Sequence, residues 1–348
     1  REEKYDFLTN NRIKDIPYVL LPKNDPMHYM VQRDYSVEES YKNGLSVYQL
    51  FENTSIGVQT HRDELVTDIK KDSLITRIKE LFATEYIKDL VSKYEIKESK
   101  HWSLENTINL EKSFKGSDIS GLTYRPFDNR YIYYNDNFVD RTRRRLGKHI
   151  NNSNLVLNLA KIVKVEWNHT LITRNIPTAI SMDINGTYFT PLYLYPEAGE
   201  QATLDQSGES TTPSFGHPSR GEELDRKPNL DMKLVGEIAK GLGLEFRDVA
   251  PWDSTTPSFG HPSSGGEYQE EESEDSPPKG GVGCEASRGG SKEKEVEYFT
   301  PIDLLDYIYA VLHSPTYREK YKEFLKIDFP RVPYPKDKVK FWKLVDLG

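Results

Sequence analysis

Apolar and polar positions in the first hundred residues follow two different periods. Residues 65–69 are β-prone and alternate imperfectly, which favours a short strand. Asp72 then precedes apolar residues spaced at i, i+1, i+4 and i+7, so we expect it to cap a helix with one apolar face. Residues 86–96 form a second amphipathic run. This part of the chain is therefore predicted to mix helices and strands, and the first apolar face carries Leu74, Ile75, Ile78 and Leu81.

From residue 124 to residue 195 the pattern becomes typical of strands. Residues 130–134 are aromatic and β-prone, and they follow a turn-like Asp128-Asn129. Residues 155–165 are mostly apolar and predict a largely buried strand, whereas residues 167–173 alternate more openly. Together with the helical runs before it, this segment indicates an α+β domain built on a mixed sheet.

A hairpin is predicted near the end of that segment. Residues 180–184 lead into Asn185-Gly186, a pair in which both residues tolerate a positive φ. Residues 187–190 are the expected return strand, and Pro191 is expected to end its pairing because proline has no N–H to donate.

Residues 198–297 differ in composition from the rest of the chain, because Gly, Ser, Pro and Glu dominate there. The decamer Ser-Thr-Thr-Pro-Ser-Phe-Gly-His-Pro-Ser occurs twice, at residues 210–219 and 254–263. A unit this short and polar cannot bury a face, so we interpret the repeat as a duplicated insertion in a surface loop. Between the copies, residues 231–244 carry apolar side chains at helical spacing. The pattern predicts a long, largely disordered insertion around one short helix.

The C-terminal residues return to ordered patterns. Thr300-Pro301-Ile302-Asp303 is typical of a helix start, with Thr as the cap, Pro at the first position and Asp303 as the capping-box acid. Ser314-Pro315 begins a second helix over residues 317–326, joined so tightly to the first that an angular helical pair is expected. Three prolines that follow should forbid more helix: Pro330, Pro333 and Pro335.

Charge and cysteine usage narrow the class of protein. The net charge of −8 argues at first against a nucleic-acid partner, but the excess of acidic residues lies within residues 201–300 and the rest is neutral to slightly basic.

The lone Cys284 excludes a disulfide framework and fits a reducing cytoplasm. The longest apolar stretch is interrupted by Asn158 and two lysines, so no membrane span is predicted. The chain begins with Arg1 and not with Met, which suggests a fragment of a longer protein.

Motifs of a self-contained enzyme are missing from the sequence. It contains no P-loop for ATP, no Gly-rich turn after a strand for a dinucleotide or S-adenosylmethionine, and no Asn-Pro-Pro-Tyr or Asp-Pro-Pro-Tyr run. The eight histidines include no pair at i, i+4, so a histidine-based metal site is not predicted. We therefore expect this segment to carry no catalytic residues, no metal and no cofactor of its own.

A basic and aromatic constellation is the strongest remaining signal. Arginine forks match phosphate oxygens and guanine edges, and asparagine can read adenine through two hydrogen bonds. The alternative for the arginine run is a solvated helix face paired with Asp136 and Asp140. For the tyrosine pair Tyr133-Tyr134, a place in the core competes with base stacking, and Asn168 and His169 are ambiguous in the same way. The candidates for DNA contacts are Arg125, Arg130, Tyr133, Arg141, Arg143, Arg144, Arg145, Lys148, Asn168 and His169.

Longer strings carry a resemblance to a known family. The most specific one runs from Asp306-Tyr307-Ile308-Tyr309-Ala310-Val311-Leu312-His313-Ser314-Pro315 through Tyr317-Arg318 to residues 324–331. Others are Tyr124-Arg125-Pro126-Phe127-Asp128-Asn129-Arg130, residues 139–143 and residues 191–196, with shorter ones at residues 55–63 and at Arg226-Lys227-Pro228-Asn229-Leu230. Together they resemble the C-terminal specificity domain of Type ISP restriction-modification enzymes and their relatives among large adenine-specific DNA methyltransferases.

The resemblance implies that a nuclease, an ATP-driven motor and an N6-adenine methyltransferase precede this segment on one polypeptide. S-adenosylmethionine, ATP and Mg²⁺ would then serve the parent enzyme. The duplicated decamer and the acidic run depart from the family pattern, which leaves the activity of this copy open.

The sequence thus predicts three parts. Residues 1–197 form a DNA target-recognition domain, residues 198–299 form the insertion, and residues 300–348 form a helical pair that packs on the recognition domain. The expected function is to bind double-stranded DNA and read a short asymmetric site, with the arginine run and Lys148 on phosphates. Arg125, Arg130, Asn168 and His169 are then expected on base edges. The alternative is a protein-interaction module that docks onto other domains of the same enzyme.

Overall fold

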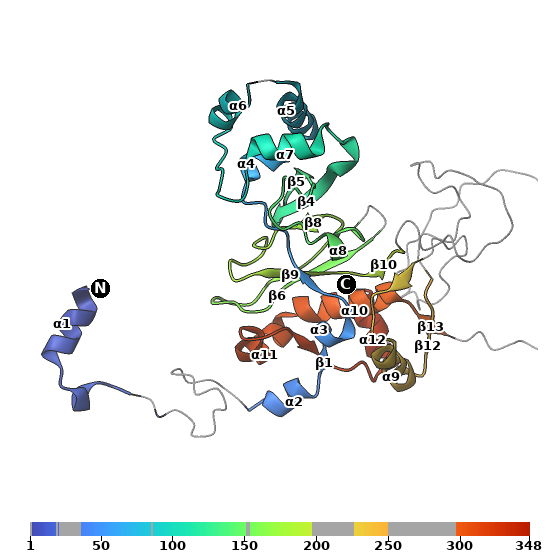
Figure 1. Cartoon of the computed structure of the whole chain (residues 1–348). Coiled ribbons are helices and arrows are strands. Elements are labelled where there is room, and N and C mark those ends of the chain that lie inside the picture. The colour runs from blue at the N-terminus through green and yellow to red at the C-terminus, as the bar shows by residue number, and fades with distance from the viewer. Residues whose placement is uncertain are drawn as a thin grey trace, which may run out of the picture.

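The computed structural model describes residues 2–18, 20, 36–84, 86–150, 154–196, 226–249 and 297–348. Apart from helix α1 (Glu2–Asn10), which buries no residue, the described elements gather around two main hydrophobic cores, one above the other in Figure 1. The upper lobe holds helices α4 to α7 and one four-stranded sheet. The lower lobe holds a second four-stranded sheet and the remaining helices. The predicted α+β class with mixed sheets is confirmed.

Helix α5 (Lys71–Ala83) anchors the upper lobe because its predicted apolar face is fully buried at Leu74, Ile78 and Leu81. Its N-cap is Lys70, so Asp72 lies in the first turn, where a carboxylate interacts favourably with the helix dipole. The expected strand at residues 65–69 is mostly wrong, because Leu65 and Val66 end a helical turn. The neighbouring helices are α4 (Asp63–Val66), α6 (Ile87–Lys93) and α7 (Leu104–Glu111).

The upper sheet has the order β3-β5-β4-β8, with antiparallel pairs except for the parallel pair β4–β8. The strand predicted at residues 130–134 is confirmed as β5, which pairs with β4 in a hairpin. That hairpin contains a register shift between Thr123 and Arg125. The strands are β3 (Thr67–Asp68), β4 (Ile119–Arg125), β5 (Asp128–Tyr133) and β8 (Ile176–Pro177).

The lower sheet has the order β2-β9-β6-β7 and explains the long apolar run in the sequence. All five positions of β6 are buried, since Leu157 and Leu159 face the large core while Val156 packs in a separate cluster with Phe189 on β9. A strand covered on both faces loses the polar alternation of a half-exposed one. The strands are β2 (Ser55–Ile56), β6 (Val156–Ala160), β7 (Thr170–Thr173) and β9 (Thr187–Pro191).

The hairpin predicted around Asn185-Gly186 is wrong in its first strand. Residues 180–184 form no strand, and Ile180 and Ile184 are exposed, so their alternation faces no core. The turn itself is present, with Gly186 at a φ of 122°. Residues 187–191 form β9, whose partners β2 and β6 come from distant parts of the chain. Pro191 still lies in register with Val156.

Helix caps in the lower lobe follow the sequence closely. Asp231 caps α9 (Met232–Leu242), and Thr300 with Asp303 forms the predicted capping box of α10 (Pro301–His313). Ser314 ends α10 and also caps α11 (Pro315–Leu325), as the tight junction required. The prolines did not end helix formation, because α12 (Lys338–Val345) begins after Pro335, with Asp337 as its cap. Its Phe341 packs against Tyr307 of α10.

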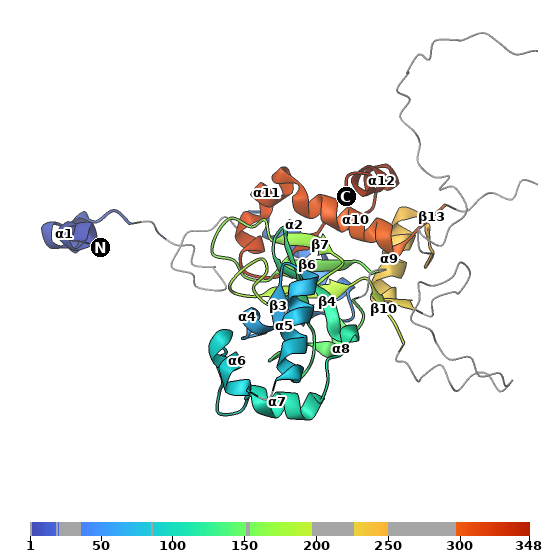
Figure 2. The same ribbon diagram turned by 90° about the horizontal axis from the view of Figure 1, so that it is seen from above.

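The smaller elements join segments that are far apart in the sequence. Strand β1 (Leu45–Ser46) pairs with β14 (Arg331–Val332), β10 (Tyr193–Leu194) with β11 (Lys227–Pro228), and β12 (Glu245–Phe246) with β13 (Tyr298–Phe299). The remaining helices are α2 (Glu38–Lys42), α3 (Val47–Leu50) and α8 (Arg144–Gly147), with 3-10 turns at Ile13–Asp15 and Gly116–Asp118. Leu146 of α8 packs with Val156 and Phe189 of the lower sheet, and the view from above shows α10 beside β6 and β7 of that sheet (Figure 2).

The predicted insertion falls largely outside the described residues. Both copies of the decamer and the acidic run lie there, and only the short helix, now α9, can be placed. The boundaries predicted after residues 197 and 299 stay predictions. Within the described ranges, residues 41–51, 157–193, 230–244 and 299–345 contribute to one large core.

Asp306 on α10 gives the fold a testable pH dependence. Burial, with a smaller contribution from Asp303, raises the pKa of its carboxyl from 3.8 to about 6. The folded state therefore binds this proton more tightly than the unfolded chain, so ionisation lowers stability as the pH rises from about 4 to 6. We predict that Asp306→Asn raises the free energy of unfolding at pH 7 and that the gain shrinks toward zero at pH 4. Urea unfolding at both pH values measures it, and an equal gain at both would rule out ionisation as the cause.

Candidate nucleic-acid interface

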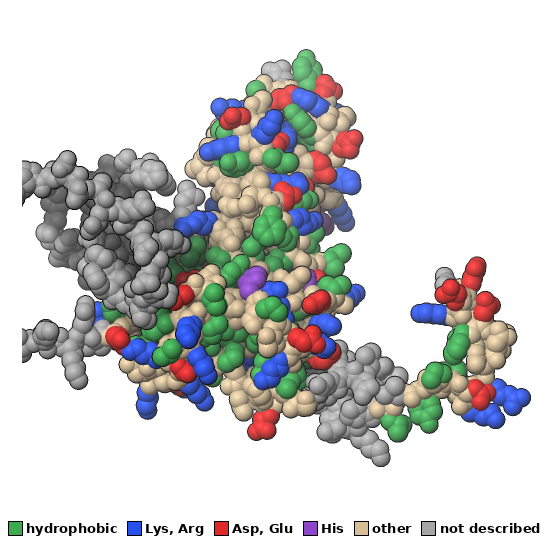
Figure 3. Space-filling view, turned by 180° about the vertical axis from the view of Figure 1, so that it is seen from behind, with side chains coloured by type: hydrophobic (Ala, Val, Ile, Leu, Met, Phe, Trp, Pro, Cys, Tyr) green, Lys and Arg blue, Asp and Glu red, His purple; other side chains and the backbone are tan. Residues whose placement is uncertain are grey.

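A cleft of about 1500 Å³ lies in the lower lobe between residues 48–55 and residues 140–149, and residues 194–196 and 226–227 close it. Two acidic side chains, Glu52 and Asp140, line it. Against them stand seven basic ones: Arg141, Arg143, Arg144, Arg145, Lys148, Arg226 and Lys227. We call this the basic cleft. The upper lobe in Figure 3 instead shows acidic and basic side chains interspersed, so the cleft is a local concentration of positive charge.

The arginine run forms a tight turn into the short helix α8. Arg143 has a left-handed backbone (φ 56°, ψ 33°), a conformation that costs a non-glycine residue about 1–2 kcal/mol. Tyr134 supports the turn from below, since its hydroxyl donates a hydrogen bond to the carbonyl oxygen of Thr142. A Cβ on Gly147 would lie 2.1 Å from that hydroxyl oxygen, so only glycine lets α8 approach Tyr134.

The arginines of this turn differ in how they are held. The Nε of Arg144 lies 2.7 Å from Asp136, and its Nη2 donates to the carbonyl oxygen of Tyr134 at 3.0 Å. Arg141 lies beside Asp140, with 3.5 Å between Nε and the carboxylate. The alternative of a solvated helix face paired with Asp136 and Asp140 therefore applies to Arg144, and in part to Arg141. Arg145 is exposed, and within the described residues its guanidinium has no hydrogen bond or ion pair. It is therefore accessible to an anion such as a phosphate group.

Asn229 holds the opposite wall of the basic cleft. Its side-chain oxygen accepts from the backbone N–H of Asn53 at 2.9 Å, and its Nδ2 lies 2.8 Å from the carbonyl oxygen of Asn53. The same Nδ2 lies 3.0 Å from the Thr190 hydroxyl and 2.9 Å from the Pro191 carbonyl. This fully buried amide thus fixes Arg226 and Lys227 at the cleft. Sequence reasoning did not propose these two residues, although the string 226–230 was noted.

Asn154 and His149 order the cleft floor. The side-chain amide of Asn154 donates to the carbonyl oxygens of His149 and Tyr193, and its oxygen accepts from the N–H of Tyr193. The Nδ1 of His149 accepts from the N–H of Tyr195 at 3.0 Å. Both side chains are buried, so their role is structural, and they position Lys148 beside the arginine turn.

The predicted base-reading residues do not line the basic cleft. Tyr133 is fully buried, packs edge-on against Phe138, and is a core residue, so its assignment to the DNA interface is wrong. His169 is also buried, 3.7 Å from Asp183, and burial lowers its pKa; Asn168 beside it is exposed. Arg130 is held by two hydrogen bonds from Nε and Nη2 to Asp128, which leaves it little freedom to read a base.

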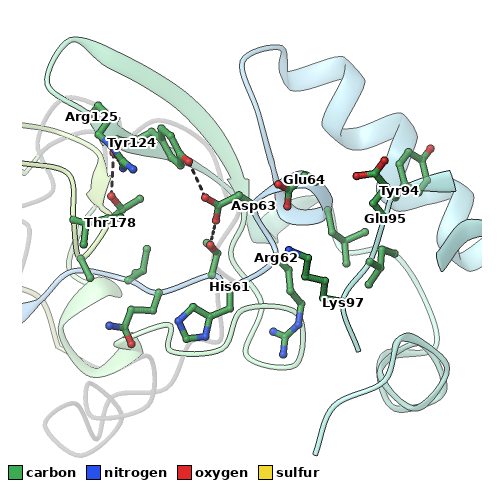
Figure 4. Close-up of a pocket in the computed structure, with 17 residues that line it drawn as sticks. His61, Arg62, Asp63, Glu64, Tyr94, Glu95, Lys97, Tyr124, Arg125 and Thr178 are labelled. Atoms are coloured by element: carbon green, nitrogen blue, oxygen red, sulfur yellow. Dashed lines mark hydrogen bonds between the residues drawn. The ribbon is translucent and has the colours of Figure 1, made fainter. Parts of the chain in front are cut away.

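Arg125 borders a second, smaller hollow of about 350 Å³ under the upper sheet, shown in Figure 4. Tyr124 donates from its hydroxyl to Asp63 at 2.8 Å, and Asp63 also accepts from Thr60. The hollow adjoins the basic cleft where Gln59 and Arg141 exchange backbone hydrogen bonds of 3.2 and 2.9 Å. We call it the upper hollow.

Metal centres and membrane spans are the two other classes of site to consider in the part of the chain that the structure describes. Over those ranges, no group of three or more His, Cys, Asp or Glu side chains is placed to hold a metal ion. None of the helices found there is long and apolar enough to cross a membrane.

Comparison with known proteins decides the family. The family model described as the Type ISP C-terminal specificity domain matches residues 49–348. The chain belongs to this family. No curated protein matches the sequence of this specificity domain.

Solved structures share the fold of the specificity domain. The cryoEM structure of a DrdV–DNA complex matches with a TM-score of 0.58 and 20% identity, over 99% of this chain and 28% of that one. A nuclease-deletion mutant of the Type ISP enzyme LlaGI, in complex with a DNA substrate mimic, gives 0.55 and 19%, over 100% and 22%. The ATP-dependent Type ISP enzyme LlaBIII bound to DNA gives 0.51 and 17%, over 91% and 16%. The specificity domain thus spans about a quarter or less of each of these chains.

We predict that Asn229→Ala destabilises the specificity domain. The substitution removes the acceptor of the Asn53 N–H and one donor from each of the carbonyl oxygens of Asn53 and Pro191, which costs about 1–3 kcal/mol. Urea unfolding measures the loss. Asn106→Ala, an exposed position on α7, is the matched control and should change the free energy of unfolding little. Equal small effects of both substitutions would remove Asn229 from its structural role.

We also predict that Gly147→Ala destabilises α8 by roughly 1–3 kcal/mol, since its Cβ would overlap the Tyr134 hydroxyl. Tyr134→Phe removes that oxygen, so the double variant should lose less stability than the sum of the two single variants. A thermal or urea double-mutant cycle gives the coupling energy. Strict additivity would mean that Gly147 and Tyr134 do not constrain each other.

Proposed function

We propose that this specificity domain binds double-stranded DNA in the basic cleft and reads a short asymmetric target for a Type ISP restriction-modification enzyme. The observation that carries the proposal is the excess of seven basic over two acidic side chains in one ordered cleft of a chain whose net charge is −8. Arginine and lysine at such a site neutralise DNA phosphates and release counterions, which is the main source of sequence-independent affinity.

The arginine turn fits the phosphate role better than a base-reading role. Its side chains project from a short loop, at the N-terminus of α8, into an open cleft. Contacts of this kind fix the register of a protein on the duplex, whereas base edges carry the sequence information. Arg125 and Asn168 are the proposed base-reading candidates that the fold leaves accessible, with Arg130 and His169 held by Asp128 and Asp183.

The enzymatic steps are proposed for other parts of the parent polypeptide. LlaBIII and LlaGI are both named as Type ISP restriction-modification enzymes in complex with DNA or a DNA substrate mimic, and LlaBIII is named as ATP-dependent. An N6-adenine methyltransferase with S-adenosylmethionine, and a motor using ATP and Mg²⁺, would act there on DNA that this domain positions. The target adenine would be flipped into the methyltransferase. The compartment proposed for this work is the cytoplasm.

The rival function is docking onto the other domains of the same enzyme through the same surfaces. The two differ in their response to salt, because only DNA binding releases a counterion for each phosphate contact. Docking between protein surfaces would not produce a steep linear dependence of log affinity on log salt for a DNA probe.

We predict that the triple variant Arg141→Ala, Arg143→Gly, Arg145→Ala binds every duplex more weakly. Each lost phosphate contact should reduce the slope of log affinity against log salt by about 0.9. Glycine is chosen at position 143 because it adopts the left-handed backbone without strain. Fluorescence anisotropy with duplexes of unrelated sequence measures both quantities.

The matched control removes three exposed lysines of the upper lobe: Lys71, Lys88 and Lys100. It changes the net charge by the same amount without touching the basic cleft, so its slope should stay close to that of the unaltered chain. Circular dichroism establishes that both variants are folded. An unchanged slope in the cleft variant, or an equal fall in both, would contradict the proposed interface.

A further inference from the structure

Phe127 lies at the tip of the β4–β5 hairpin, and its ring is 93% exposed. Single exposed apolar side chains are common on protein surfaces and need no explanation by themselves. Phe127 differs from such residues in three respects: its backbone conformation, the side chains around its turn, and its position in the fold.

The backbone of the turn is unsuited to phenylalanine. Residues 126 and 127 connect Arg125 and Asp128, which pair across the hairpin. Proline at the second position and a φ of 63° at Phe127 are the pattern of a type II turn, whose third position favours glycine or asparagine. A bulky residue with positive φ is a strained outlier, and such strain concentrates at functional sites. The geometry of the turn does not require an aromatic side chain, so it does not explain why residue 127 is phenylalanine.

Side chains beside the turn brace the hairpin that carries the ring. Arg130 binds Asp128 with two of its guanidinium nitrogens, and its guanidinium carbon lies 3.7 Å from the centre of the Tyr124 ring. Arg125 also lies over Tyr124, at 4.4 Å, and Tyr124 is tied to Asp63. The hairpin therefore carries an exposed apolar ring at its tip and two braced guanidinium groups on its strands.

The position of the hairpin places this point near the proposed DNA path. Arg125 and Tyr124, at the base of the turn, line the upper hollow, and Figure 4 shows both beside Asp63 and Thr178. Gln59 lines that hollow and Arg141 lines the basic cleft, and their backbones exchange two hydrogen bonds. A duplex in the cleft that extends past this pair would approach the hairpin.

We infer that Phe127 is a wedge that inserts between adjacent base pairs and stacks on an unstacked base. Phenylalanine and proline are side chains that proteins use to open a base step, and every base offers a face for stacking. The inference rests on the proposed DNA binding and adds a contact that the charged cleft cannot supply.

The test uses the 348-residue chain and two DNA probes, a fully paired duplex and the same duplex with one central abasic site. The abasic step is already unstacked, so a wedge enters it at lower cost. The unaltered chain should prefer the abasic duplex by about tenfold, and Phe127→Gly should lose that preference. Its salt slope should not change, because no phosphate contact is removed. Phe127→Trp should keep the preference.

Three controls make the result decisive. Glycine and asparagine both suit the left-handed backbone, so Phe127→Gly and Phe127→Asn should melt no lower than the unaltered chain. Tyr86→Ala removes another exposed aromatic ring, 72% accessible, and should leave the preference intact. Salt-dependent binding without any abasic preference, or a preference that survives Phe127→Gly, overturns the wedge and leaves the basic cleft standing. Absence of salt-dependent binding by the unaltered chain overturns both.

Discussion

The buried amide of Asn229 makes the basic cleft possible. It joins residues 53, 190 and 191, which the sequence places far from residue 229, and it satisfies backbone groups that would otherwise be buried without partners. Arg226 and Lys227 lie at the cleft because this amide and the short β10–β11 pair hold their segment there. The two basic side chains of this wall therefore depend on a polar network in the interior.

The other wall of the cleft depends on close packing. Tyr134, a core residue, supports the arginine turn through two hydrogen bonds, one to Thr142 and one from Arg144, and Gly147 leaves room for its hydroxyl. This arrangement requires a strained, left-handed backbone conformation at Arg143, the N-cap of α8. It leaves Arg145 and much of Arg141 facing solvent while Arg144 is fixed by Asp136. A rigid backbone that presents mobile cations suits contacts to phosphates, whose positions repeat along any duplex.

Local patterns predicted the local structure well and the long-range pairing poorly. The apolar face of the helix at residues 71–83 and the buried strand β6 follow from spacing, and the caps Thr300 and Ser314 follow from cap chemistry, whereas Asp72 is not the cap that the sequence predicts. The first strand of the Asn185-Gly186 hairpin failed because β9 finds its partners in β2 and β6. Tyr133 could not be assigned from composition, since an aromatic on a strand looks the same buried or exposed. Arg226 and Lys227 reach the cleft only through tertiary contacts, so no linear signal marks their role.

Arginine footprinting tests the central claim most directly. The chain is treated with phenylglyoxal in the presence and absence of duplex DNA, and mass spectrometry gives the modification of each arginine. DNA should protect Arg141, Arg143, Arg145 and Arg226, while Arg12, which lies outside both lobes, should react equally in both states. Protection of other arginines with none at the cleft would contradict the account.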